Sequence, residues 1–113
     1  MTRTELISRT NQLIEEGARL QANPSLDALR TWLQLSDDLL SVAWGSMDRY
    51  HLSWLQVGRP KEIVRGRPML DAEAAAYVRE VAAAKTAVLR MSVEAAGRRN
   101  MPFVGETPDT PTG

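Results

Sequence analysis

The sequence predicts an all-α protein: a three-helix antiparallel bundle over residues 1–99, followed by a disordered Pro/Thr/Gly-rich tail over residues 100–113. Two observations lead to this prediction. Apolar residues recur every seven positions in two columns through the middle of the chain, and Pro and Gly residues separate three segments of helical periodicity. Such spacing places side chains on one helical face, whereas strands alternate with a period of two. The columns are Leu26, Leu33, Leu40, Met47 and Trp54, and Leu29, Ser36, Ala43, Tyr50 and Val57.

The composition is that of an average globular domain, with 43% hydrophobic and 25% charged residues and a net charge of zero. The length of 113 residues suits one domain. The chain has no cysteine, which excludes disulfides, thiolate metal sites and cysteine nucleophiles. No apolar run approaches the roughly 18 residues of a membrane span, and no signal-peptide segment is evident. We therefore expect a cytoplasmic protein without a membrane partner.

The first helix is expected from about Arg3 to Leu20. Thr2 and Glu5 have the spacing of a capping box, in which each side chain binds a backbone N–H group of the first turn. The apolar stripe is narrow, and charges of both signs cover the remaining surface. This pattern predicts a helix that docks on a neighbour along one face. The stripe consists of Leu6, Ile7, Leu13, Ile14 and Leu20.

The second helix is predicted to begin at Asn23-Pro24, because Asn is a favoured N-cap and Pro is tolerated in the first turn. The columns stay in phase to Val57, which favours one long, bent central helix. Gly45-Ser46 could instead end this helix, since Gly often follows a helix and Ser often precedes one; this alternative stays open. A third apolar row widens the apolar arc, so the helix needs partners on two sides. That row is Trp32, Leu35, Leu39 and Val42.

Gly58 and Pro60 end the second helix, and the last helix is expected over about Ala72–Ala96 with Asp71 as its N-cap. Alanines on its inward face allow close approach to a bulky partner, for which the central helix is the expected complement. Beyond it the composition changes to Pro, Thr and Gly, which predicts disorder. The apolar cluster at residues 101–104 either folds back on the body or acts as a docking motif.

The 58–68 segment is electropositive, with four basic residues against one acidic residue. Within it, Arg65-Gly66-Arg67-Pro68 resembles the Arg-Gly-Arg-Pro core of the AT-hook family over these four residues. The resemblance implies that both arginines enter the narrow minor groove of A·T-rich DNA, where Gly permits close approach and the negative potential attracts Arg. Contact with another anion or an acidic partner, and a solvated loop, are the alternatives. The basic residues are Arg59, Lys61, Arg65 and Arg67.

His51 is the only histidine, and Asp48 precedes it by three positions, so the two could share a helical face and a hydrogen bond. We expect this histidine at the edge of the apolar stripe rather than in a catalytic site. The acidic pairs lack the spacing of metal-binding bundles, and the sequence has no phosphate-binding glycine loop. We therefore expect no enzyme activity, no metal and no cofactor.

The predicted central helix is longer than the first helix, so we expect apolar surface on its C-terminal part to stay uncovered within one chain. The expected partner interface is Met47, Tyr50, His51 and Trp54, with a second copy of the chain as the simplest partner. We expect a non-catalytic helical protein–protein interaction module, such as an adaptor, an inhibitor or an assembly subunit. The alternative is a nucleic-acid-associated protein that contacts DNA through the 58–68 loop.

Overall fold

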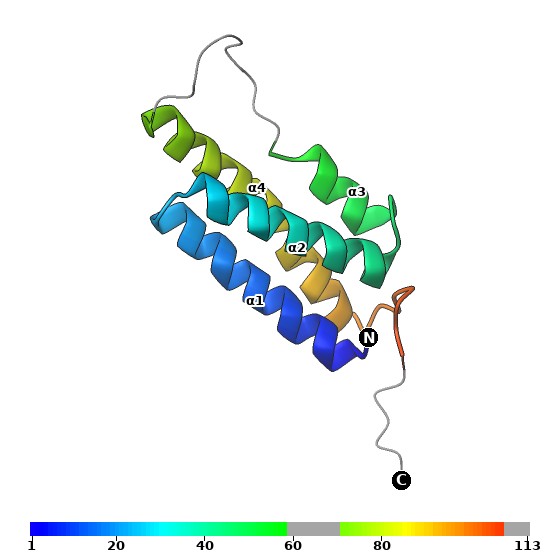
Figure 1. Cartoon of the computed structure of the whole chain (residues 1–113). Helices are drawn as coiled ribbons and strands as arrows, with labels where there is room; N and C mark the ends of the chain where they lie inside the picture. Colours follow the sequence, from blue (N-terminus) through cyan, green and yellow to red (C-terminus); the bar gives the residue numbers. More distant parts are fainter. Residues whose placement is uncertain (59–70, 108–113) are drawn as a thin grey trace.

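The computed structural model describes residues 1–58 and 71–107, and the chain in these ranges is helical and without strands (Figure 1). The predicted all-α class is confirmed. The described residues form four helices rather than three, because the expected central helix is divided in two. The helices are α1 (Arg3–Ala22), α2 (Leu26–Trp44), α3 (Arg49–Gln56) and α4 (Asp71–Gly97).

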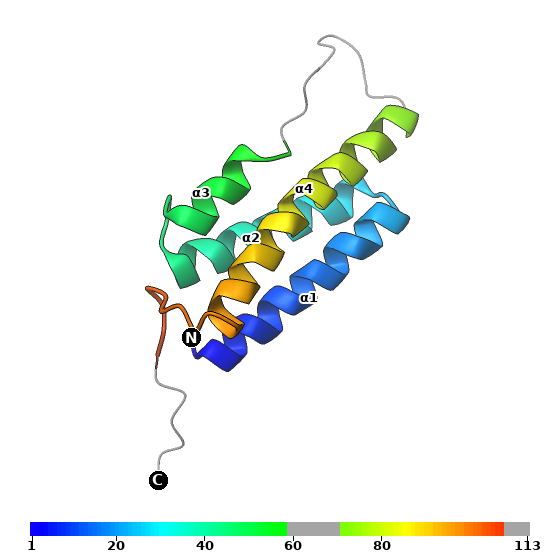
Figure 2. The same ribbon diagram turned by 180° about the vertical axis from the view of Figure 1, so that it is seen from behind.

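Three long helices, α1, α2 and α4, pack side by side, and the short α3 lies against α2 and α4 (Figures 1 and 2). α1 packs most extensively on α4, so the expectation that the central helix is the main partner of α4 is wrong. The core between them contains leucines from all three long helices, such as Leu6, Leu29 and Leu89, together with Trp54 of α3. None of the described helices is long and apolar enough to cross a membrane.

Close packing of α1 on α4 depends on Gly17 in the C-terminal half of α1. A Cβ atom at this position would overlap the Oγ1 atom of Thr86 on α4 and come within 3.1 Å of the Trp32 ring on α2. Gly17 is therefore a point at which all three long helices approach one another closely. Small buried residues of α4, such as Ala82 and Ala96, support the same close approach.

The central segment breaks at Gly45, so the prediction of one continuous helix is wrong and the alternative break is observed. Gly45 has a φ of 103°, which side-chain-bearing residues rarely adopt, and its carbonyl accepts a hydrogen bond from the Asp48 N–H at 3.1 Å. The Asp48 carboxylate accepts a hydrogen bond from the Arg49 N–H at 2.8 Å and begins α3. The heptad phase continues through the turn, but the chain changes direction.

Residues 100–107 fold back on the helices, so the prediction of disorder from residue 100 is wrong for this part of the tail, and of the two alternatives for residues 101–104 the fold-back is observed. Phe103 is buried against Trp44, with ring centroids 5.6 Å apart. The Gly105 N–H donates to the Ala43 carbonyl at 2.9 Å, which satisfies a backbone group at the end of α2. The returning tail thus completes the core at the end where α1 begins and α2 and α4 end (Figure 1). Residues 108–113 lie outside the described residues.

Candidate interaction groove

The expected partner interface is largely buried within the chain. Tyr50, His51 and Trp54 are only 6%, 5% and 4% exposed, whereas Met47 at the turn before α3 is exposed. The break at Gly45 folds α3 back, so these side chains pack against their own chain. The expectation that this stretch remains uncovered for a partner is therefore wrong for the three buried residues. Trp44 contacts Tyr50 edge to face, with ring centroids 4.7 Å apart.

His51 links the turn to α2 rather than forming the expected pair with Asp48. Its Nδ1 atom accepts a hydrogen bond from the Met47 N–H at 2.8 Å, and its Nε2 atom contacts the Asp37 carboxylate of α2. Because Nδ1 faces a donor, the ring proton lies on Nε2 and is donated to Asp37. Both ring nitrogens are therefore engaged in holding α3 against α2.

A second contact that holds α3 comes from the buried Lys85 on α4, a residue that no sequence pattern marks for this role. Its ammonium group lies 4.0 Å from the centre of the Trp54 ring and donates a hydrogen bond to the Trp54 carbonyl. The aromatic face and the carbonyl both favour the cation. Lys85 therefore attaches α3 to α4, a contact that the heptad pattern of the central segment does not indicate.

The four basic residues proposed for nucleic-acid contact all fall within residues 59–70, outside the described residues. No described contact therefore bears on the AT-hook resemblance. These residues are Arg59, Lys61, Arg65 and Arg67.

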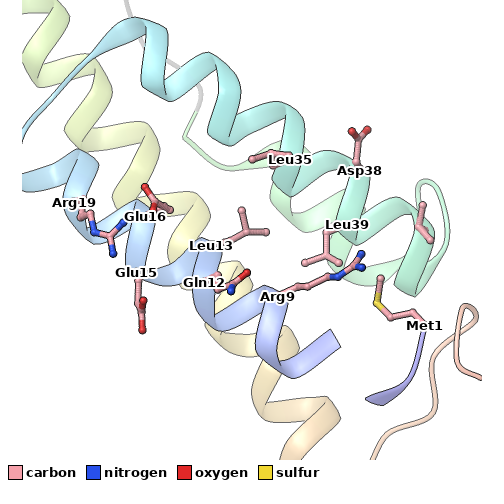
Figure 3. A pocket seen from close by; sticks show the side chains of 11 residues that line it. Met1, Arg9, Gln12, Leu13, Glu15, Glu16, Arg19, Leu35, Asp38 and Leu39 are labelled. Carbon is pink, nitrogen blue, oxygen red and sulfur yellow. Dashed lines mark hydrogen bonds and ion pairs between the residues drawn. The ribbon is translucent and has the colours of Figure 1, made fainter. Parts of the chain in front are cut away.

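A groove of about 670 Å³ lies between α1 and α2 (Figure 3). Leu13 from α1 and Leu39 from α2 are buried at its base. Leu35 and Val42 line its α2 side and are 54% and 61% exposed. The third apolar row of α2 is therefore only partly buried within the chain. Leu39 is buried beside α1, whereas Leu35 and Val42 of the same row stay exposed.

Charged side chains line both sides of the groove. Arg9 and the ion pair of Glu16 with Arg19 come from α1, and Asp38 comes from α2 (Figure 3). Arg9 lies 3.8 Å from the Glu5 carboxylate, and Asp38 accepts a hydrogen bond from the neutral Gln34 amide at 3.0 Å. Such exposed contacts within one helix are weak, about 0.3–0.5 kcal/mol, so a partner can replace them. The groove can therefore bind an apolar surface with charges at its edges.

Comparisons of the chain with family models, with curated proteins and with solved structures gave no match. The proposed function is therefore inferred from the residues that line the groove.

Proposed function

We propose that the protein is a non-catalytic helical protein–protein interaction module whose contact surface is the groove between α1 and α2. The observation that carries this proposal is the exposure of Leu35 and Val42, two large apolar side chains seven positions apart on one face of α2. Contiguous exposed apolar surface bordered by polar residues is typical of protein interaction sites.

The shape and chemistry of the groove fit an apolar helical surface of a partner. Two neighbouring helices with an apolar base between them offer a groove into which side chains of partner helices can pack. Full burial of Leu35 and Val42 by such a partner would contribute roughly 1 kcal/mol or more each, because each is about half exposed at present. The charged edges would then fix the orientation of the partner.

Site-specific photo-cross-linking in cells tests this proposal. A photoreactive amino acid replaces Leu35 in the groove, or Met91 of α4 as the matched control, because Met91 is 57% exposed and does not line the groove. We expect protein adducts from position 35 that decrease when Val42→Asp is added, and few adducts from position 91. Equal adducts from both positions, or none from position 35, would contradict the proposed function.

A further inference from the structure

We infer that the occupant of the groove is the same groove of a second copy, in a symmetric dimer whose two-fold axis runs parallel to the helices. This inference rests on the proposed function and specifies the partner. It follows from the positions of opposite charges on the two sides of the groove, measured along the helix axes and called heights below.

α1 and α2 run antiparallel from the turn around Pro24, so residues equally far from Pro24 along the chain lie at similar heights (Figure 1). The hydrogen bond from Trp32 Nε1 to the Leu13 carbonyl, 2.8 Å long, joins the two helices in this register. Arg9 lies fifteen residues before Pro24, and Asp38 lies fourteen residues after it. A cation on α1 and an anion on α2 therefore lie at nearly the same height, on opposite sides of the apolar base.

A two-fold axis parallel to the helices places the groove of one copy opposite the groove of the other. This rotation leaves the height of every residue along the axis unchanged. α1 then faces α2 of the partner subunit, and the two helices run antiparallel, as in four-helix bundles. Arg9 meets Asp38 of the partner subunit, and the symmetric contact forms at the same time. Two equivalent ion pairs thus flank the apolar contact.

The other way to bring the two grooves face to face is a two-fold axis that lies in the interface and runs perpendicular to the helices. It would pack α2 on α2 of the partner subunit, with Leu35 opposite Val42 of the partner subunit. Asp38 lies between these two positions in the sequence, so two Asp38 carboxylates would meet near the axis. Like charges at an interface oppose association, so charge complementarity selects the parallel axis.

The apolar contact supplies the attraction in this dimer. Leu35 and Val42 each lie at the edge of the groove, where they can cover the base of the opposite groove formed by Leu13 and Leu39 of the partner subunit. The same two side chains, now more than half exposed, become buried in both copies at once.

Sedimentation of the purified full chain at concentrations up to about 100 µM is the first test, because a dimer with a dissociation constant in the micromolar range is then populated. We expect a dimer that Leu35→Arg converts to a monomer and that Met91→Arg leaves intact. Circular dichroism of each variant establishes that it is folded. A folded wild-type chain that stays monomeric overturns the inference, as does a dimer that Leu35→Arg does not weaken.

Exchanging the charges at positions 9 and 38 tests the direction of the two-fold axis. Arg9→Asp and Asp38→Arg each place like charges opposite one another at both symmetric contacts, so each variant alone should dimerise roughly tenfold or more weakly than the wild type. An equimolar mixture should form heterodimers with an affinity close to that of the wild type. In the heterodimer the carboxylate introduced at position 9 faces the guanidinium introduced at position 38, and the native Arg9 and Asp38 face each other at the second contact.

Native mass spectrometry resolves this heterodimer when one variant carries a mass tag. A mixture that associates no better than its components overturns the proposed arrangement.

Failure of the dimer and failure of the proposed function give different results. A monomeric chain that still forms groove-dependent adducts with other proteins in cells would retain the proposed function and overturn the dimer. A dimer insensitive to Leu35→Arg, together with no adducts at position 35, would overturn both.

Discussion

Arg3 and Glu106, 103 positions apart in the sequence, form an ion pair in which the Arg3 Nη2 atom lies 3.0 and 2.9 Å from the two carboxylate oxygens. The Arg3 Nη1 atom donates to the carbonyls of Ala96 and Met101 at 2.6 and 3.0 Å. The guanidinium also lies 5.6 Å from the centre of the Phe103 ring. One side chain at the start of α1 thus holds both the end of α4 and the returning tail.

Replacement of Arg3 tests whether this contact stabilises the fold. Arg3→Ala removes two carbonyl hydrogen bonds and a partly exposed ion pair, so we expect the free energy of unfolding to fall by about 1–2 kcal/mol. Arg98→Ala is the control, because Arg98 forms a highly exposed pair with Glu94. Urea denaturation measures both variants. Equal effects of the two substitutions would contradict the special role of Arg3.

The tail itself should contribute measurably through Phe103. Phe103→Ala removes a buried ring from the cluster with Trp44, and substitutions of this kind cost about 3–5 kcal/mol. Val104→Ala in the neighbouring exposed position should change stability by less than about 0.5 kcal/mol. Urea denaturation monitored by tryptophan fluorescence distinguishes the two. A Phe103→Ala variant as stable as Val104→Ala would show that the tail does not pack in solution.

A methyl group at position 17 should disrupt the contact of α1 with α4. Gly17→Ala places a Cβ atom against the Thr86 hydroxyl and close to Trp32, and overpacking of this kind costs about 1–3 kcal/mol. Adding Thr86→Ala removes the nearest atom and should restore part of the stability. Gly97→Ala is the control, because its Cβ would have a nearest neighbour at an ordinary 3.7 Å. A thermal melt that leaves Gly17→Ala unchanged would contradict the close approach.

The His51 bridge should stabilise the turn between α2 and α3. His51→Phe leaves the Met47 N–H and the Asp37 carboxylate without this partner, which should cost about 1–3 kcal/mol. Asp37→Asn should cost less, because the amide oxygen still accepts the proton from Nε2. Chemical denaturation measures both. A larger loss for Asp37→Asn than for His51→Phe would contradict the assigned tautomer.

The sequence predicts those features that neighbouring residues decide. The capping box of α1 is observed, with the Glu5 N–H donating to Thr2 Oγ1 at 3.1 Å. The start of α2 is shifted by two residues, because Ser25 rather than Asn23 accepts the capping hydrogen bond, from the Ala28 N–H at 3.2 Å. The break at Gly45 is harder to predict, since an internal glycine costs only about 1 kcal/mol and the heptad phase is the same on both sides of the turn.

Features that depend on distant residues escape prediction from the sequence. The apolar cluster at residues 101–104 makes fold-back of the tail one of two possibilities, but the contacts that hold it, with Arg3 and Ala43, are not connected to the tail by any local pattern. The wide apolar arc of α2 does predict that this helix needs cover on two sides. It does not predict that α1 hides Leu39 while Leu35 stays exposed, because that depends on the angle at which two helices pack.

The yield of photo-cross-linked protein adducts at position 35 relative to position 91 is the most direct measurement of the central claim, that the α1–α2 groove is a protein contact surface. We predict adducts at position 35 that greatly exceed those at position 91 and that include a species of twice the mass of the chain. Equal yields at the two positions would contradict the claim.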